Sequence, residues 1–165
     1  MTPLRGQKSQ YYEGGIRVPL IVAAPGVTTP GSVCSEPVTS TDFYPTMLEL
    51  AGLEAMPRQH LDGLSLVPLL RGGRHLRRDA IYWHFPLYHF SCSAVRSGDW
   101  KLIEFFEDDR IELYNLAEDI GETNDLSGSY PGRAKNLRQM LHRWRKQVDA
   151  SIPKPNPDYR PAQDR

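Results

Sequence analysis

The chain has 165 residues, of which 39% are hydrophobic and 24% charged, a composition typical of a folded globular protein rather than a disordered one. Its 20 basic and 20 acidic side chains cancel, so no overall field directs it to nucleic acid or to an anionic membrane. No apolar run approaches the roughly 20 residues that a membrane-spanning helix needs. We therefore expect neither nucleic acid nor a membrane as partner, and the composition leaves the cellular location open.

The first 24 residues combine two kinds of segment. Residues 4–10 form a polar loop that carries Lys8, and residues 16–24 are a β-branched run that predicts a strand. Pro19 indicates that this strand lies at a sheet edge or contains an irregularity. A lysine on a loop that leads into a buried strand could hold a positive charge over an anion. A solvated surface lysine is the simpler interpretation from these residues alone.

Residues 25–79 contain two helical patterns. Ser40 or Thr41 is placed to cap a helix that ends at Gly52, with Asp42 in its first turn as a capping residue rather than a catalytic one. Apolar side chains at helical spacing predict a single buried face, made of Phe43, Met47, Leu50 and Ala51. A second, short helix is expected within residues 62–70, before two glycines.

A basic segment follows this second helix. Its members are Arg71, Arg74, His75, Arg77 and Arg78. The segment could attract an anionic substrate, but a solvated connector is the simpler interpretation.

From residue 80 the pattern changes to short β-prone runs separated by short polar loops. The runs predict an antiparallel meander of four strands over residues 80–85, 93–97, 100–106 and 110–116. The third run reads as a strand with only one face buried. A helix is predicted over residues 133–150, with Leu137, Leu141, Trp144 and Val148 facing the sheet. Acidic residues dominate 104–125 and basic ones 133–146, so we expect these stretches to face each other.

Several of these stretches, in order, resemble segments of the sulfatase family within the alkaline-phosphatase-like superfamily. They are Leu4-Arg5-Gly6-x-Lys8, Tyr12-Glu13-Gly14-Gly15-Ile16-Arg17-Val18-Pro19, residues 41–52, 62–70 and 94–103, and Glu112-Leu113-Tyr114-Asn115-Leu116 with residues 119–126. The resemblance implies an α+β chain. Residues 1–79 would end the alkaline-phosphatase-like α/β domain, 80–152 would form the antiparallel sheet with its C-terminal helix, and 153–165 a proline-rich tail.

The resemblance also implies a role for the lysine segment. In the family this lysine contacts the substrate sulfate, so Lys8 is the catalytic and substrate-binding candidate. Gly14 and Gly15 are expected to adopt backbone angles closed to other residues.

The rest of the implied chemistry lies elsewhere. Sulfatases use a formylglycine made from a cysteine in a Cys-x-Pro-Ser-Arg motif and a divalent metal, usually calcium, and both precede the lysine segment in the family. We expect neither to be held by this chain alone. Cys92-Ser93-Ala94-Val95-Arg96 fits a looser Cys-x-Ala-x-Arg spacing, but it falls in a predicted strand, whereas the family's nucleophile opens a helix. Cys34 and Cys92 are the only cysteines, and we interpret them as free thiols rather than a disulfide.

A second candidate site follows the first predicted strand of the meander. His84, Tyr88 and His89 could line a substrate pocket or could be ordinary loop residues packed under aromatic rings. Of these three residues, His84 is our candidate for substrate binding.

The preferred hypothesis is a C-terminal portion of a sulfuric ester hydrolase that is inactive alone. Its expected partners are a sulfated small molecule or glycan and the N-terminal sulfatase region. One alternative is a non-catalytic module that binds a sulfated ligand or complements a separate N-terminal half. Another is part of a phosphate or phosphonate ester hydrolase.

Overall fold

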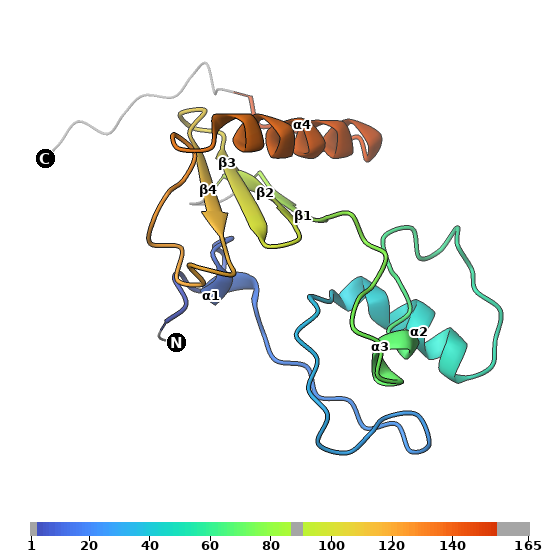
Figure 1. The fold of residues 1–165 in the computed structure, drawn as a ribbon. Coiled ribbons are helices and arrows are strands. Elements are labelled where there is room, and N and C mark those ends of the chain that lie inside the picture. The colour runs from blue at the N-terminus through green and yellow to red at the C-terminus, as the bar shows by residue number, and fades with distance from the viewer. Residues whose placement is uncertain (1–2, 87–90, 155–165) are drawn as a thin grey trace, which may run out of the picture. The chain divides into compact units, whose positions relative to one another are not determined.

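A computed structural model describes residues 3–86 and 91–154, which form two compact units (Figure 1). The first unit combines the N-terminal residues up to Val18 with the chain from Asp79 onward, and the second comprises Pro19–Arg78. Tyr88, His89 and nearly all of the proline-rich tail fall outside the described residues. The division into sulfatase domains at residues 79 and 152 stays a prediction, because it refers to the complete enzyme.

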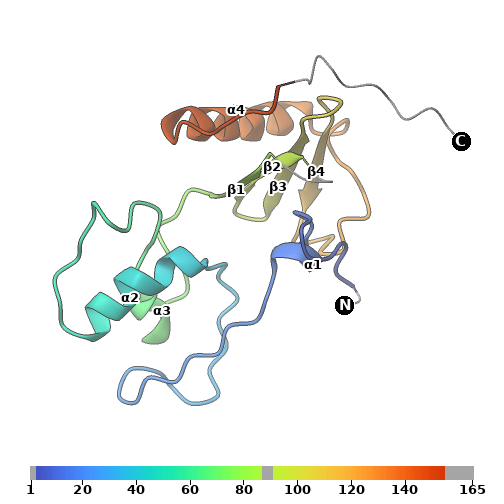
Figure 2. The same ribbon diagram turned by 180° about the vertical axis from the view of Figure 1, so that it is seen from behind.

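The first unit is built on an antiparallel sheet with the strand order β1-β2-β3-β4 (Figures 1 and 2). The strands are β1 Ile81–Phe85, β2 Cys92–Ser97, β3 Trp100–Phe105 and β4 Ile111–Asn115, and helix α4 spans Pro131–Gln147. The α+β class, the four-stranded meander and the C-terminal helix are thereby confirmed. Each strand pairs with its sequence neighbour, because the short turns between the runs favour hairpins.

Both faces of the sheet are covered. On one face Val95, Leu102 and Leu113 pack against Leu137 and Leu141 of α4. On the other face a second cluster contains Tyr12 from the N-terminal segment with Ala94, Ile103 and Tyr114 of the strands. The prediction of a half-buried third strand is therefore wrong, because the N-terminal segment covers the face that was expected to meet water.

The N-terminal segment contains a single helical turn, α1 Glu13–Ile16. The strand predicted over residues 16–24 is absent, and residues 17–24 adopt no regular structure. Ile21 is 93% exposed and Val18 is 78% exposed, so the apolar run has no cover within the described residues. A β-prone sequence forms a strand only when a neighbouring strand pairs with it, and none of the four described strands does so.

The second unit contains the short 3₁₀ helix η1 Ser40–Asp42, helix α2 Phe43–Leu50 and the single-turn helix α3 Val67–Leu70. Asp42 is fully buried and accepts hydrogen bonds from the backbone N–H of Thr39 at 2.7 Å and of Leu64 at 2.9 Å. Its capping role is confirmed, with Thr39 as the N-cap, one residue before the earliest position expected. Gly52 ends the helix in the left-handed conformation with φ of 68°.

The buried face of α2 differs from the predicted one. Met47 is 63% exposed and Phe43 is 40% exposed, whereas Leu48 and Thr46 are buried. The Thr46 hydroxyl accepts the backbone N–H of Leu66 at 2.8 Å, which joins the helix to the residue before α3. The helix therefore buries its side toward α3 and leaves the more apolar stripe without cover from the described residues.

No helix in the described part of the chain is long and apolar enough to cross a membrane.

Candidate functional site

Lys8 lies in a tight turn. The backbone N–H of Gln10 donates to the carbonyl of Gln7 at 3.0 Å, and the Gln10 side-chain oxygen accepts the N–H of Gln7 at 3.0 Å. Ser9 has φ of 76°, a left-handed conformation that non-glycine residues adopt rarely. The Lys8 side chain is exposed, and the described residues provide it with no hydrogen bond or ion pair. The turn thus presents one free ammonium group from a closed loop.

Two glycines hold this loop against α1 by close approach. A Cβ on Gly14 would lie 2.5 Å from the carbonyl oxygen of Arg5, and one on Gly15 would lie 2.1 Å from that of Gln10. Neither glycine has a positive φ, so the expectation of unusual backbone angles is wrong. The sequence needs glycine at both positions because the loop carbonyls leave no room for a side chain.

A buried ion-pair cluster joins the end of the loop to the sheet. The Nζ atom of Lys101, a fully buried residue of β3, lies 2.9 Å from Glu13 and 2.8 Å from Glu122. Glu122 also accepts the backbone N–H of Glu13 at 2.6 Å. Burial raises the pKa of Glu122, and the nearby Lys101 ammonium only partly opposes this shift. Glu13 takes part in two of these three contacts, one through its carboxylate and one through its backbone, so it anchors the lysine motif to the sheet.

A second polar cluster fixes the start of the loop. Arg5 donates to the Tyr114 hydroxyl at 2.9 Å and lies over the Tyr12 ring at 3.9 Å. Glu112 is buried and accepts the hydroxyls of both Tyr12 and Tyr114 at 2.7 Å. Burial, reinforced by these bonds to Glu112, raises the pKa of both tyrosines, so they stay protonated donors. The cluster also pairs Glu112 with Arg110 of the loop before β4.

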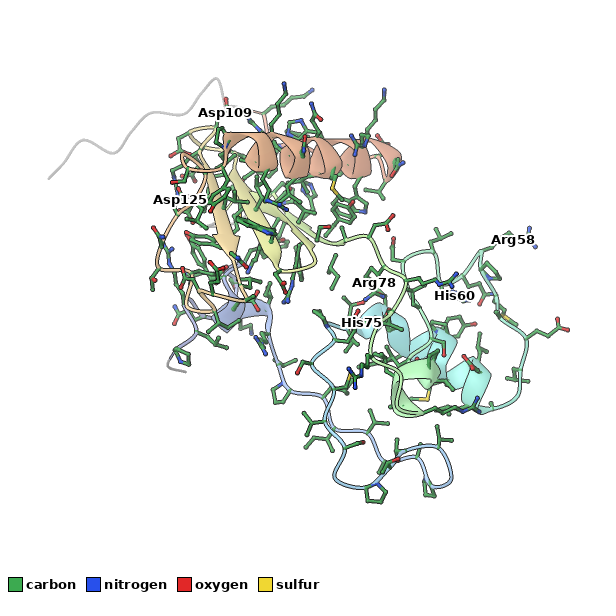
Figure 3. The ribbon with its side chains drawn as sticks, in the orientation of Figure 1. Arg58, His60, His75, Arg78, Asp109 and Asp125 are labelled. Carbon is green, nitrogen blue, oxygen red and sulfur yellow. The ribbon has the colours of Figure 1, made fainter. Side chains whose placement is uncertain are left out.

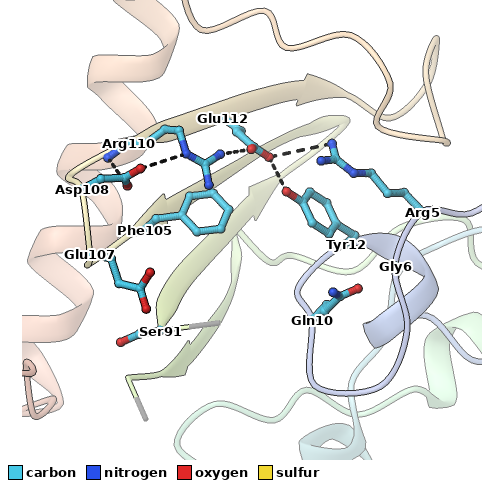
Figure 4. A pocket seen from close by; sticks show the side chains of 10 residues that line it. All are labelled: Arg5, Gly6, Gln10, Tyr12, Ser91, Phe105, Glu107, Asp108, Arg110 and Glu112. Carbon is cyan, nitrogen blue, oxygen red and sulfur yellow. Dashed lines mark hydrogen bonds and ion pairs between the residues drawn. The ribbon is translucent and has the colours of Figure 1, made fainter. Parts of the chain in front are cut away.

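A pocket of about 450 Å³ opens beside these groups (Figure 4). It is lined by Arg5, Gly6, Gln10, Tyr12, Ser91, Phe105, Glu107, Asp108, Arg110 and Glu112. Gly6 and Gln10 flank Lys8 in the sequence, so the loop that presents the lysine also forms part of the pocket wall. The remaining lining is polar around the Phe105 ring, which the Arg110 guanidinium covers at 3.8 Å. Its volume falls in the range of small-molecule sites, which is roughly 300–1,000 Å³.

His84 lies on the opposite face of the sheet from this loop. It pairs with Ser93 in the register of β1 and β2, and its Nδ1 atom lies 2.6 Å from the Ser93 hydroxyl. Its Nε2 atom donates to the carbonyl of Ser151 at 2.8 Å. The ring also packs edge-on against Phe106 and Trp144. The structure therefore separates the two substrate-binding candidates, and both ring nitrogens of His84 have partners within the chain.

The same face carries a cation cluster around one carboxylate. Glu104 is 3% exposed and accepts Arg138 at 2.5 Å, Arg145 at 2.5 Å and His142 at 2.9 Å. Burial alone would raise the pKa of Glu104, but the bonds from these α4 side chains outweigh it and hold the pKa below its ordinary value. The expected contact between the acidic and basic stretches is confirmed at this position, where Arg138 also lies 3.9 Å from Asp109.

Cys92 does not lie in the setting expected of a sulfatase nucleophile. It begins strand β2, is 2% exposed, and burial raises the pKa of its thiol to about 12. Cys34 is exposed, and both thiols are free. The described residues also contain no group of three or more His, Cys, Asp or Glu side chains that could hold a metal ion. The described residues thus provide no site that fits a formylglycine or a calcium ion.

Local sequence patterns did not bring together several of the residues that build the site. Lys101, Glu122 and Glu112 meet the lysine segment from positions 88 to 109 residues away along the chain. The only available hint was Glu13, a carboxylate within an otherwise scaffold-like motif. The residues next to Lys101 in the sequence do not indicate that this lysine of the third strand is buried.

The four-stranded antiparallel sheet with its C-terminal helix fits the C-terminal region of a sulfatase, and comparison with known proteins agrees. Residues 7–150 match the family model described as N-sulphoglucosamine sulphohydrolase, C-terminal, and the chain belongs to this family. It is 40% identical over 162 residues to a sulfatase of Formosa agariphila, covering 87% of this chain and 29% of that protein. The chain therefore spans less than a third of this curated relative.

Solved structures give the same result. One protein, crystallised with k-i-k-neocarrahexaose, matches with a TM-score of 0.77 and 30% identity, covering 87% of this chain and 32% of its own. Another, crystallised with its substrate D-glucosamine-2-N,6-O-disulfate, matches with a TM-score of 0.54 and 32% identity, over 68% of this chain and 24% of its own. A phosphonate monoester hydrolase from Silicibacter pomeroyi matches with a TM-score of 0.57 and 26% identity, covering 76% of this chain and 28% of that protein.

Proposed function

We propose that this chain supplies the sulfate-contacting lysine and part of the substrate pocket to a sulfuric ester hydrolase. Lys8 is the group that carries the proposal, because its ammonium is exposed, without a partner among the described residues, and held by a closed turn. A fixed cation offsets the negative charge of a sulfate ester as the ester bond breaks, and needs little reorganisation during the reaction.

The anchors of the loop support this role. Glu13 and Arg5 attach the two ends of the lysine segment to the same sheet, through Lys101 and Tyr114. A lysine that only solubilised the surface would not need a loop fixed at both ends. The pocket beside Gly6 and Gln10 is the proposed place for the part of the substrate next to the sulfate. The substrate-binding role of His84 stays a prediction.

The proposal also includes an N-terminal sulfatase region as partner. This region would provide the formylglycine and the calcium, and the chain alone would be inactive. Support comes from the apolar side chains left uncovered: Val18 and Ile21 in the β-prone run, and Met47 on α2. Large apolar patches on soluble proteins usually mark surfaces that another element covers. The matched sulfatase of Formosa agariphila is more than three times as long as the matched region, so that relative has further chain that could supply such an element.

A chimera tests the role of Lys8. The N-terminal region of the Formosa agariphila sulfatase, joined to this chain in place of its own C-terminal region, should hydrolyse a sulfate ester. Lys8→Ala should lower kcat by roughly 100-fold or more, the usual loss when one preorganised charge-stabilising group is removed. Lys135→Ala removes the same charge from the exposed surface of α4 and should leave kcat unchanged. Equal activity of the two variants would refute the proposal.

Two alternatives have their own tests. The likeness to a phosphonate monoester hydrolase supports assaying a phosphonate monoester beside the sulfate ester. A higher kcat/KM for the phosphonate would change the substrate class and keep the role of Lys8 as an anion contact. Metal-dependent hydrolysis by this chain alone would contradict its proposed inactivity. Binding of a sulfated ligand without turnover by the chimera would favour a non-catalytic module.

A further inference from the structure

The connector after α3 is the most strongly charged short segment of the second unit. Residues 71–78 contain four arginines and no acidic residue. In the sequence this segment looked like a solvated linker, but it is held at three points within the second unit, twice through its backbone and once through the Arg78 side chain.

The first fixed point is the end of α3. Gly72 adopts the left-handed conformation with φ of 93°, and the N–H of Gly73 donates to the carbonyl of Pro68 at 2.8 Å. A Cβ on Gly73 would lie 2.6 Å from that carbonyl oxygen, so only glycine fits there without a shift.

The second and third points hold the rest of the segment (Figure 3). Glu36 accepts the backbone N–H of Leu76 at 3.1 Å, and its other oxygen lies 3.1 Å from Nδ1 of His75. Arg78 forms an ion pair with the buried Asp42 and is itself 11% exposed. The segment is thus anchored at its beginning, middle and end.

These anchors divide the arginines into two groups. Arg78 is neutralised by Asp42 inside the unit. Arg71, Arg74 and Arg77 are exposed, and the described residues give them neither a hydrogen bond nor an ion pair. Glu36, which contacts the segment, is engaged by His75 and Leu76 rather than by an arginine. Asp79 comes directly after the segment in the sequence. Three guanidinium groups therefore face solvent from a fixed backbone.

We propose that Arg71, Arg74 and Arg77 form a binding site for a sulfated polysaccharide, separate from the lysine that contacts the ester to be cleaved. The guanidinium fork donates two parallel hydrogen bonds to a tetrahedral oxyanion or a carboxylate. Because the backbone is fixed before binding, less conformational entropy is lost on association than in a mobile linker. The choice of a sulfated glycan, rather than another polyanion, rests on the proposed function and on the disulfated sugar bound by a matched structure.

A second basic surface competes with this one and serves as a control. On α4, Lys135, Arg143 and Lys146 are exposed and form no hydrogen bond or ion pair with the described residues, while Arg138 and Arg145 are engaged by Glu104. The arginine segment is favoured because all three of its free cations are guanidinium forks, whereas two of the three on α4 are lysines.

The test measures binding of a heparin fragment to the full chain by fluorescence anisotropy at several salt concentrations. We compare Arg71→Gln/Arg74→Gln/Arg77→Gln with Lys135→Gln/Arg143→Gln/Lys146→Gln, which removes the same charge. The first variant should bind at least tenfold more weakly at low salt. Its slope of log K against log salt should fall by about 2, since each neutralised charge on a flexible polyanion contributes about 0.7. The α4 variant should change affinity less than threefold.

Several results of the same experiment would contradict the proposal. It is overturned by no binding to heparin, by an equal loss in the α4 variant, or by equally tight binding of de-sulfated heparin. Equally tight binding of single-stranded DNA of the same charge would mean a general polyanion site and would also overturn it. Gly73→Ala keeps every charge but displaces the anchored backbone, and it should weaken heparin binding. The catalytic proposal is tested by kcat of the chimera on a small sulfate ester, and this one by the heparin affinity of the chain, so failure of one is distinguishable from failure of the other.

Discussion

The loop of Lys8 and the side chain of His84 lie on opposite faces of the same four-stranded sheet. The loop of Lys8 is joined to one face through Glu13 and Lys101, while the His84 ring points toward Ser93 and Trp144 under α4 on the other. The two residues therefore have different tests, although the sequence suggested a shared substrate.

His84 links β1 to the chain that follows α4. His84→Ala removes the hydrogen bond to the Ser151 carbonyl, so amide hydrogen exchange over residues 148–154 should become faster. His84→Gln retains a donor and should show a smaller effect. In the chimera, a fall in kcat/KM for His84→Ala would support its substrate-binding role. Unchanged kcat/KM with faster exchange would limit His84 to holding this segment.

Lys101 should be essential for the stability of the first unit. Lys101→Met leaves Glu13 and Glu122 buried without their cation, and breaking a buried pair in this way typically costs about 3–5 kcal/mol. All three tryptophans, Trp83, Trp100 and Trp144, lie in this unit, so their fluorescence during urea unfolding reports on it alone. Lys135→Met on exposed α4 should change the unfolding free energy by less than about 0.5 kcal/mol. Similar losses for both variants would contradict the anchoring role.

Gly15→Ala should disturb the lysine loop. The added Cβ would meet the carbonyl oxygens of Gln10 at 2.1 Å and Gln7 at 2.5 Å, and overpacking of this kind costs about 1–3 kcal/mol. Hydrogen exchange over residues 5–16 should become faster. Gly132→Ala, on α4 with open space around it, should be neutral or stabilising by up to about 1 kcal/mol. An undisturbed loop in Gly15→Ala would show that the close approach does not hold Lys8.

Glu104 should make the first unit sensitive to acid. Its folded pKa lies below the ordinary value of 4.5, so its contribution is present above that value and is lost as pH falls through the folded pKa. Glu104→Gln should lower stability near pH 7, because Arg138 and Arg145 lose their counter-charge. It should also flatten the decline of tryptophan-monitored stability below about pH 4.5. Glu107→Gln is the exposed control, and a profile identical to that of Glu104→Gln would rule out this explanation.

The two thiols should differ sharply in reactivity. Cys34 is exposed, whereas Cys92 is buried and the pKa of its thiol is raised to about 12, so little thiolate forms near pH 8. A chromogenic disulfide reagent should label one thiol in the folded chain and two in denaturant. The Cys34→Ser variant should lose the fast reaction. A fast reaction in that variant, or a formylglycine mass at Cys92 after co-expression with maturation enzymes, would reopen the nucleophile hypothesis.

Local patterns predicted the elements that depend on local interactions. The β-prone runs and polar turns predicted strands β1 to β4. The apolar spacing of Leu137 and Leu141 predicted the buried face of α4. Prediction failed where burial depends on a distant partner. Residues 16–24 have the composition of a strand, but none of the described strands pairs with them, and no described residue covers Met47 on α2. Lys101 looked like a polar strand position because Glu122, its buried partner, lies in a loop whose path the sequence does not reveal.

The hydrogen bond between Tyr12 and Glu112 spans 100 residues of chain, and this has a consequence for how the protein is made. At about 5–20 residues per second, the ribosome needs about 5–20 s to add the strand that receives Tyr12. During that time the lysine segment has emerged while the sheet that anchors it does not yet exist. Docking of the lysine segment onto the sheet is therefore a late step of folding, and contacts between residues distant in the sequence form slowly. Newly made chains should depend on chaperones mainly until β4 is complete.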